Sequence, residues 1–151
     1  MPGQPYFEDV AEGDALPDLA FGPLTIVHTV RWAALTENWY RLHYDREFVA
    51  RAEGEPRFIA SGGFRQALVC RMLTDWLGPA GRLHRLTIRQ LYPTREGDRF
   101  LCHARVASRH ADADPPRLTC EVWATNGDGR EVLRGTGVVS LPRRDSRGAG
   151  S

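Results

Sequence analysis

Asn38 and His43 lie five residues apart in the segment ALTENWYRLHYD, and their side chains could together act on a water molecule. His43 could serve as a general base, because an imidazole titrates near neutral pH. Asn38 cannot take up a proton, but its amide has donors and an acceptor and could orient a water. The structural alternatives are that Asn38 is a helix C-cap in the left-handed conformation and that His43 is a partly buried side chain satisfied by the backbone.

The clearest helix is predicted to begin after Ser61, a good N-cap residue, and to end at Gly78-Pro79. The start of a helix leaves backbone N–H groups free, and Gly62 and Gly63 would let a ligand approach these groups closely. Apolar side chains recur every four residues along the helix: Phe64, Leu68, Met72 and Trp76. The helix therefore has an apolar face that must be buried.

Two further segments precede this helix. A short helix is predicted between Asp45, as its N-cap, and Gly54. The segment LTIVHTVRWAALTEN is predicted to pass from a short strand or turn into another helix, and residues 1–23 are predicted to form an extended lead-in on the surface.

After residue 82 the apolar period changes to two, which predicts four strands. The residues expected to share a face include His84, Leu86, Ile88 and Tyr92 in the first strand, and the turn sequences REGD and NGDG separate strands. The four strands are predicted to form an antiparallel meander. A long helix followed by strands predicts an α+β domain, in which one curved antiparallel sheet wraps around the central helix, as in the hotdog fold.

The chain of 151 residues is predicted to form one domain, residues 1–142, with a disordered tail at residues 143–151. A formal net charge of +1 gives no reason to expect a nucleic-acid partner. Cys70, Cys102 and Cys120 have no metal-ligand spacing and are predicted to be reduced core residues. The sequence shows no signal peptide and no apolar run of membrane-spanning length, which predicts a cytoplasmic protein without membrane association.

Four stretches resemble the MaoC-like hydratase/dehydratase family of the hotdog superfold, which includes R-specific enoyl-CoA hydratases. They are YFEDVAEGDALPDL, ALTENWYRLHYDREFV, FIASGGFRQALVCRML and YPTREGDRFLCHARV, and the resemblance covers roughly residues 6–141. Asn38 stands where many members have Asp, although one branch of the family is similar in having Asn there. Ser61 stands where the family usually has His before the glycine.

The resemblance implies a lyase that adds water to, or removes it from, an α,β-enoyl thioester carried by coenzyme A or a carrier protein. The phosphopantetheine would be part of the substrate, and neither a further cofactor nor a metal is expected. His43 would be the general acid and base, and Asn38 would orient the water. Backbone N–H groups near Ser61, Gly62 and Gly63 would stabilise the enolate oxygen, and Ser61 could add its hydroxyl.

The resemblance also implies a homodimer or a heteromer with another hotdog subunit, with the substrate tunnel along the interface. An exposed sheet edge independently favours a dimer. Trp39, Tyr40 and Phe64 would line the tunnel, or would simply pack.

Two other functions are consistent with the sequence. The replacements at Asn38 and Ser61 suit a non-catalytic hotdog subunit that partners another MaoC-like chain. A specialised biosynthetic enzyme could use the same site for another conjugate addition or elimination. Four arginines, Arg65, Arg82, Arg85 and Arg89, could meet coenzyme A phosphates, but a solvated basic face is the favoured interpretation.

Overall fold

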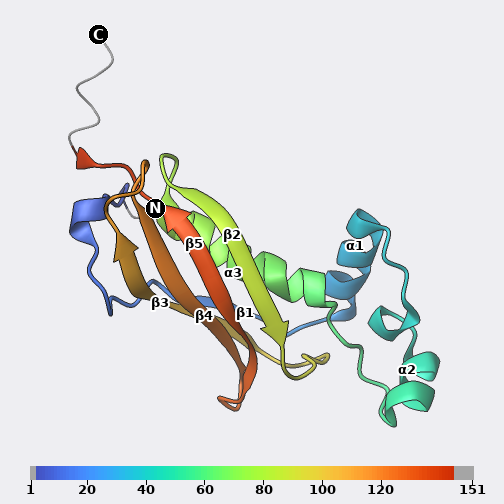
Figure 1. Ribbon diagram of the computed structural model, residues 1–151. Helices are drawn as coiled ribbons and strands as arrows, with labels where there is room; N and C mark the ends of the chain where they lie inside the picture. Colours follow the sequence, from blue (N-terminus) through green and yellow to red (C-terminus); the bar gives the residue numbers. More distant parts are fainter. Residues whose placement is uncertain (1–2, 145–151) are drawn as a thin grey trace.

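The computed structural model describes residues 3–144 (Figure 1). Apart from its first two residues, the predicted tail at 143–151 lies outside the described residues. Arg144, the last of them, forms an ion pair with Asp9 near the start of the chain.

A five-stranded antiparallel sheet forms one layer of the molecule, in the order β1-β3-β4-β5-β2. The strands are β1 (Leu19–Phe21), β2 (Arg82–Gln90), β3 (Phe100–His110), β4 (Arg117–Asn126) and β5 (Glu131–Ser140). The predicted four-strand meander is therefore wrong in two respects. The lead-in contributes β1 as a fifth strand, and β2 pairs with β5 rather than with β3. Alternation of apolar residues indicates which face a residue occupies, but not which strand lies beside it.

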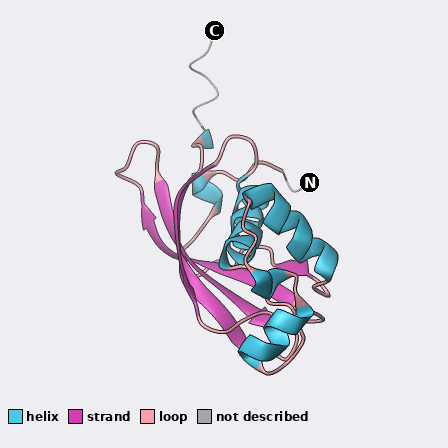
Figure 2. Cartoon of the chain, turned by 90° about the vertical axis from the view of Figure 1, so that its right-hand side faces the viewer, coloured by secondary structure: helices cyan, strands magenta, loops and turns pink. Residues whose placement is uncertain are grey.

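The helices lie on one side of this curved sheet (Figure 2). The central helix α3 (Gly62–Leu77) runs behind the strands, while α1 (Ile26–Thr36) and α2 (Arg46–Glu53) project beyond one end of the sheet (Figure 1). Short 3-10 turns occur at η1 (Phe7–Asp9) and η2 (Arg41–His43). The predicted hotdog arrangement, one antiparallel sheet curved around one long helix, is confirmed.

The core lies between α3 and the inner face of the sheet. From the helix it contains Leu68, Val69, Met72, Leu73 and Leu77, and from β3 and β4 it contains Phe100, Cys102, Ala104, Val106, Leu118, Cys120, Val122 and Ala124. The predicted inner faces of β3 and β4 are thus confirmed. Gly137 permits the close approach of helix and sheet, because a Cβ atom there would lie 3.1 Å from Leu73 Cδ1.

The predicted face of β2 is wrong at both ends. A register shift between Leu83 and Arg85 places Leu83, instead of His84, on the side of the core. Tyr92 lies beyond the end of the strand and is 45% exposed. Only Leu86 and Ile88 of the expected set pack against the core.

The three cysteines are free thiols. Cys102 and Cys120 are buried as predicted, and burial raises the pKa of these thiols to about 12 and about 11. Cys70 is only partly buried. Within residues 3–144, no group of three or more His, Cys, Asp or Glu side chains is arranged to hold a metal ion. No helix in the same part of the chain has the length and apolar character needed to cross a bilayer.

Shortening Leu73 tests the packing of α3. Leu73 is fully buried, so Leu73→Ala should lower the free energy of unfolding by about 2–5 kcal/mol, measured by urea denaturation. Arg71→Ala, on the exposed side of the same helix, is the control and should change this energy by less than about 0.5 kcal/mol. Equal losses in the two variants would contradict the assignment of Leu73 to the core.

Candidate active site

His43 is the buried member of the predicted pair. It ends the turn η2, and only 8% of its surface is exposed. Its Nδ1 lies 2.7 Å from the backbone oxygen of Ile59. A carbonyl oxygen can only accept, so Nδ1 carries the proton and Nε2 of the neutral ring keeps a free lone pair. His43 is therefore hydrogen-bonded to the backbone through Nδ1 and still presents an unprotonated Nε2, so the structural and the functional interpretations are compatible.

The carbonyl that orients His43 is itself held in place. Ile59 N donates to Leu42 O at 3.1 Å, so both backbone groups of Ile59 hold η2. The segment around Ile59 pairs with the loop after β2, where Ala60 N donates to Thr94 O at 2.9 Å and Glu96 N donates to Phe58 O at 2.8 Å. The His43 ring is thus fixed by a short ladder of backbone hydrogen bonds.

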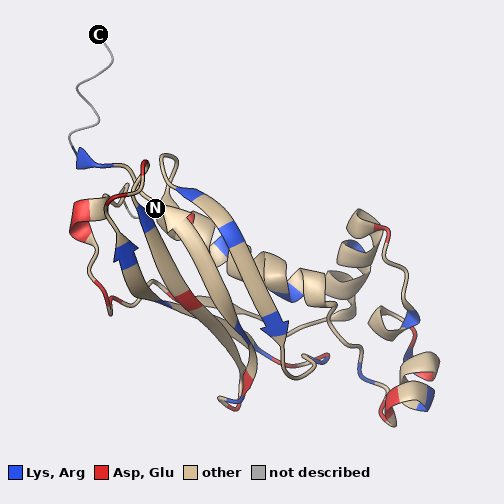
Figure 3. Ribbon diagram, in the orientation of Figure 1, with Lys and Arg blue, Asp and Glu red and all other residues tan. Residues whose placement is uncertain are grey.

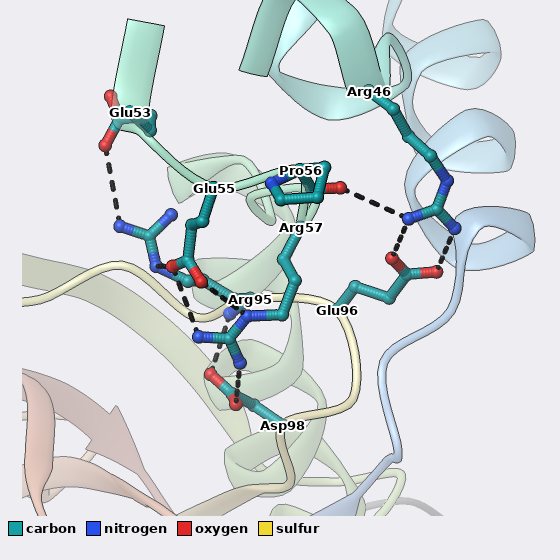
Figure 4. Close-up of polar contacts among 8 residues, drawn as sticks. All are labelled: Arg46, Glu53, Glu55, Pro56, Arg57, Arg95, Glu96 and Asp98. Carbon is teal, nitrogen blue, oxygen red and sulfur yellow. Dashed lines mark hydrogen bonds and ion pairs between the residues drawn. The ribbon is translucent and has the colours of Figure 1, made fainter. Parts of the chain in front are cut away.

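An ion-pair network reinforces this ladder (Figure 4). Arg46 binds both oxygens of Glu96 at 2.8 and 2.9 Å, and Arg95 binds Glu55 at 2.7 Å. The full network consists of Arg46, Glu53, Glu55, Arg57, Arg95, Glu96 and Asp98, and Arg46 also donates to Pro56 O. Exposed ion pairs add little stability, but this network joins α2, the segment after it and the loop 94–98 into one unit.

Asn38 follows directly on the end of α1. The residue in the left-handed conformation is Glu37, with φ of 53°, so the alternative in which Asn38 takes that position is wrong. The backbone N–H of Asn38 donates to Ala33 O at 3.0 Å, and its side chain is exposed. Within residues 3–144 the amide of Asn38 has no hydrogen-bond partner, which leaves it available to a ligand or a water.

The acid nearest to His43 in sequence has a structural role. Asp45 caps α2 by accepting from Phe48 N at 2.9 Å and also binds the Arg41 guanidinium at 2.7 Å. These bonds to Phe48 N–H and then to Arg41 lower the pKa of the Asp45 carboxyl, so it is ionised at neutral pH. Asp45 therefore positions the segment rather than exchanging protons.

Ser61, Gly62 and Gly63 form the start of α3, as predicted. Ser61 is the N-cap, and its Oγ accepts from Phe64 N at 3.1 Å. Gly62 and Gly63 are the first two helical residues, so their N–H groups have no acceptor within the helix. Ile59, which orients His43, is only two residues before Ser61, so the candidate base and the candidate oxyanion donors lie on one continuous piece of chain.

Aromatic side chains border the helix start, and the sequence interpretation missed two of them. Trp32 lies beside Gly63, where a Cβ atom would be 3.6 Å from the indole. The Trp32 and Phe64 rings meet edge to face at 5.6 Å, and Phe64 meets Phe21 at 5.3 Å. Phe64 thus packs in a cluster with Trp32 and Phe21. Trp32 lies three residues after Thr29, a buried residue of α1, so helical spacing could have placed it on the inner side of the helix.

Trp39 and Tyr40 lie between the two predicted catalytic residues and are largely exposed, at 55% and 54%. The Tyr40 ring meets His43 at 5.9 Å, and the Trp39 ring meets Tyr44 at 6.2 Å. That Trp39 and Tyr40 line a tunnel remains a prediction. Both side chains are exposed, so a tunnel would form only if a second protein surface faced them.

Arg65 is buried, with 6% of its surface exposed, so its assignment to a solvated basic face is wrong. It lies one turn after Ser61, where its guanidinium reaches the loop after β2 and donates to Tyr92 O at 2.5 Å. Desolvation lowers the pKa of Arg65 to about 10, which leaves it cationic at neutral pH. Its Nε has no partner within residues 3–144, and no carboxylate of that part of the chain pairs with it.

Solved structures identify this arrangement of elements. No protein-family model matches the chain, and a search of curated proteins gives no match. R-hydratase PhaJ1 from Pseudomonas aeruginosa, in its unliganded form, is 18% identical with a TM-score of 0.80, and the match covers 92% of this chain and 86% of that one. The ChsH1-ChsH2 complex from Mycobacterium tuberculosis is 24% identical with a TM-score of 0.75, over 87% of this chain and 98% of that one.

A MaoC-like dehydratase is 25% identical with a TM-score of 0.75, over 94% of this chain, which spans 43% of that protein. The resemblance in the sequence is thus supported by structural neighbours of the same kind. This chain has the hotdog fold of the MaoC-like hydratases and dehydratases.

Proposed function

We propose that this protein is a lyase of the MaoC-like type, which adds or removes water across an α,β-enoyl thioester. The observation that carries the proposal is the hydrogen bond from His43 Nδ1 to Ile59 O at 2.7 Å. It leaves Nε2 as the basic atom, and the same stretch of chain leads directly into the free N–H groups at Gly62 and Gly63. A base and an oxyanion site supplied together are what conjugate addition to a thioester requires.

In the hydration direction, Nε2 of His43 removes a proton from water while the water oxygen bonds to the β-carbon. The electron pair of the double bond moves to the thioester oxygen, where the N–H groups of Gly62 and Gly63 and the helix dipole stabilise the negative charge. The imidazolium then delivers the proton to the α-carbon, and the thioester carbonyl re-forms. One histidine is sufficient, because the proton that it removes is the proton that it returns.

Asn38 holds the attacking water in this proposal. Its amide oxygen accepts from the water while His43 removes the other proton. Asn38 does not titrate, so His43 is the only member of the pair that exchanges protons. The substrate handle is coenzyme A or the phosphopantetheine of a carrier protein, and the reaction as proposed uses no other cofactor and no metal.

Replacing His43 tests the identity of the base. His43→Ala should lower kcat for hydration of crotonyl-CoA by about 10²- to 10⁴-fold, followed as loss of the enoyl absorbance. His43→Asn should lose as much activity while retaining a side-chain donor for Ile59 O, which separates loss of the base from loss of the hydrogen bond. His110→Ala, an exposed histidine on β3, is the control and should keep full activity. Full activity of both His43 variants would contradict the proposal.

Replacing Asn38 tests the orientation of the water. Asn38→Leu should lower kcat roughly tenfold to a hundredfold, because it removes the hydrogen bond to the attacking water. Asn38→Asp should remain active, because a carboxylate also accepts from water. Glu37→Gln provides an exposed neighbour as control. If Asn38→Leu is as active as this control, Asn38 has no role in the reaction.

We also propose that a second hotdog subunit covers the surface beside the site. Large apolar side chains are exposed on α1 and just after it: Val27, Val30, Leu35, Trp39 and Tyr40. Val27 and Val30 are one helical turn apart on α1, and neighbouring exposed apolar side chains mark protein interaction sites. The ChsH1-ChsH2 structure is a complex of two different proteins, which supports a heteromer as the alternative to a homodimer. If this chain is inactive alone and active only with its partner, it is either the non-catalytic subunit or a subunit that supplies only part of the active site.

Cytoplasmic location remains a prediction.

Charges placed on α1 test this interface. The double variant Val27→Glu/Val30→Glu should sediment as a monomer under conditions where the wild type sediments as a dimer, because buried unpaired carboxylates oppose association. Arg51→Glu on α2 changes the net charge by the same amount away from this surface and should leave the dimer intact. A wild-type protein that is monomeric, and fully active alone, would contradict the proposed interface.

A further inference from the structure

A groove of about 640 Å³ lies on the face of the sheet opposite α3, the face turned to the viewer in Figure 1. It extends over strands β2 to β5, and its lining includes Thr87, Arg89, Arg105, Trp123, Arg134 and Thr136. The volume lies in the range of small-molecule sites. The proposed lyase reaction uses none of these residues.

The strand register places three of these side chains in one row. Trp123 pairs with Arg134, and Arg134 pairs with Arg89, so the three share a face across β4, β5 and β2. Directly paired side chains in antiparallel strands are close neighbours, and like charges in such pairs repel. A sheet face that met only solvent would favour opposite charges at these positions. An anion between the two guanidinium groups would convert the repulsion into attraction.

The carboxylates near the groove leave Arg89 uncompensated. Arg134 binds Glu131 at 2.5 Å, and Arg105 binds Glu121 at 2.6 Å. Within residues 3–144, Arg89 has no carboxylate partner. The groove is therefore lined by three arginines and two glutamates, and the excess positive charge lies on β2, an edge strand with several basic positions (Figure 3).

Trp123 forms a rigid aromatic wall at the other end of the row. The His103 ring stacks on it with centroids 5.4 Å apart and an angle of 25°. His103 is held in turn by Asp18, 2.9 Å from Nδ1, and by Thr125 Oγ1, 3.3 Å from Nε2. With His103 fixed on one ring face, the indole is held in orientation beside the groove. An indole held in this way is a good platform for another planar ring.

We propose that this groove binds a phosphorylated nucleotide, with its base stacked on Trp123 and a phosphate held between Arg89 and Arg134. Two strand spacings separate Trp123 from Arg89, about 10 Å, which suits the span from the base of a nucleotide to its phosphates. The hydroxyls of Thr87 and Thr136 lie in the neighbouring row, in register with each other, and are available to the sugar or to a phosphate.

Two ligands share this chemistry. One is the adenosine 3′,5′-bisphosphate portion of a coenzyme A substrate, in which case the inference rests on the proposed function. The groove and the helix start are at the same end of β2, since Gln90, the residue after Arg89, donates to Gly62 O at 3.2 Å. The other is a free nucleotide that binds independently of any thioester.

Calorimetric titration of the full-length protein tests binding without requiring turnover. Adenosine 3′,5′-bisphosphate and ADP are the probes, with adenosine and inorganic phosphate as partial ligands that should bind more weakly. Arg89→Gln should weaken binding by about tenfold to a hundredfold, through loss of a charge-assisted hydrogen bond. Trp123→Leu should weaken it by about tenfold, and Trp123→Phe should retain most of it. Arg82→Gln removes the same charge from the same strand outside the groove and should bind like the wild type.

The absence of saturable binding to the wild type would overturn the inference. Equal weakening by Arg82→Gln and Arg89→Gln would also overturn it, because it would reveal only a general charge effect. A third contrary result is that Arg89→Gln or Trp123→Leu dissociates an oligomer while neither nucleotide binds, since the face would then be a protein interface. Nucleotide binding by a protein without hydratase activity would leave this inference intact and would contradict only the proposed reaction.

Kinetics with two substrates identify which ligand the groove takes. If it holds the coenzyme A nucleotide, Arg89→Gln should raise KM for crotonyl-CoA about tenfold or more and leave KM for crotonyl-pantetheine unchanged. If it holds a free nucleotide, both KM values should be unchanged in Arg89→Gln, and coenzyme A should not compete with ADP in the titration.

Discussion

The packing of α3 into the curve of the sheet limits where every other element can lie. Leu73 and Leu77 on the helix, together with Val122 and Leu133 on the strands, are removed almost completely from water. Burial of such side chains is the main favourable contribution to folding. Because α3 shares this core with the inner face of the sheet, its N-terminus emerges at one end of the sheet (Figure 1).

The candidate site is built at that end mainly from backbone groups. Ile59 O orients His43, the cap at Ser61 starts α3, and the Asp45 carboxylate caps α2. The polar side chains that surround them form ion pairs with each other rather than with His43. This division leaves one titratable group, His43, to exchange protons in the proposed reaction. It also explains how a segment far from the centre of the core can hold an imidazole in a defined tautomer.

The arginines on the two faces of the sheet differ in burial and in the groups that they contact. Arg65, on the helix side, is buried and bound to a backbone carbonyl without a carboxylate, which fits a role in tying α3 to the loop after β2. Arg89 and Arg134, on the opposite face, are exposed and directly paired in register. Burying the charge of Arg65 costs free energy, and its hydrogen bond to the backbone carbonyl offsets part of that cost, since a buried charge needs hydrogen bonds. In the exposed pair, Glu131 compensates Arg134, while Arg89 has no carboxylate partner within residues 3–144.

Local sequence patterns were sufficient for much of this description. The period of four along α3, the period of two along β3 and β4, and the caps at Asp45 and Ser61 report on neighbours within a few residues, and the structure confirms each of them. The hotdog fold followed from their order and from the resemblance to MaoC-like proteins. The types of the reactive residues, Asn38 and His43, were also visible without any structure.

The partners of those residues depended on the folded chain, because they come from segments far apart in sequence. Ile59 meets His43 across 16 residues, and β2 finds β5 rather than its neighbour β3. The burial of Arg65 and the arginine pair across β2 and β5 follow from such pairings. Periodicity records which way a side chain faces, whereas strand order and long-range contacts are decided by how the whole core packs.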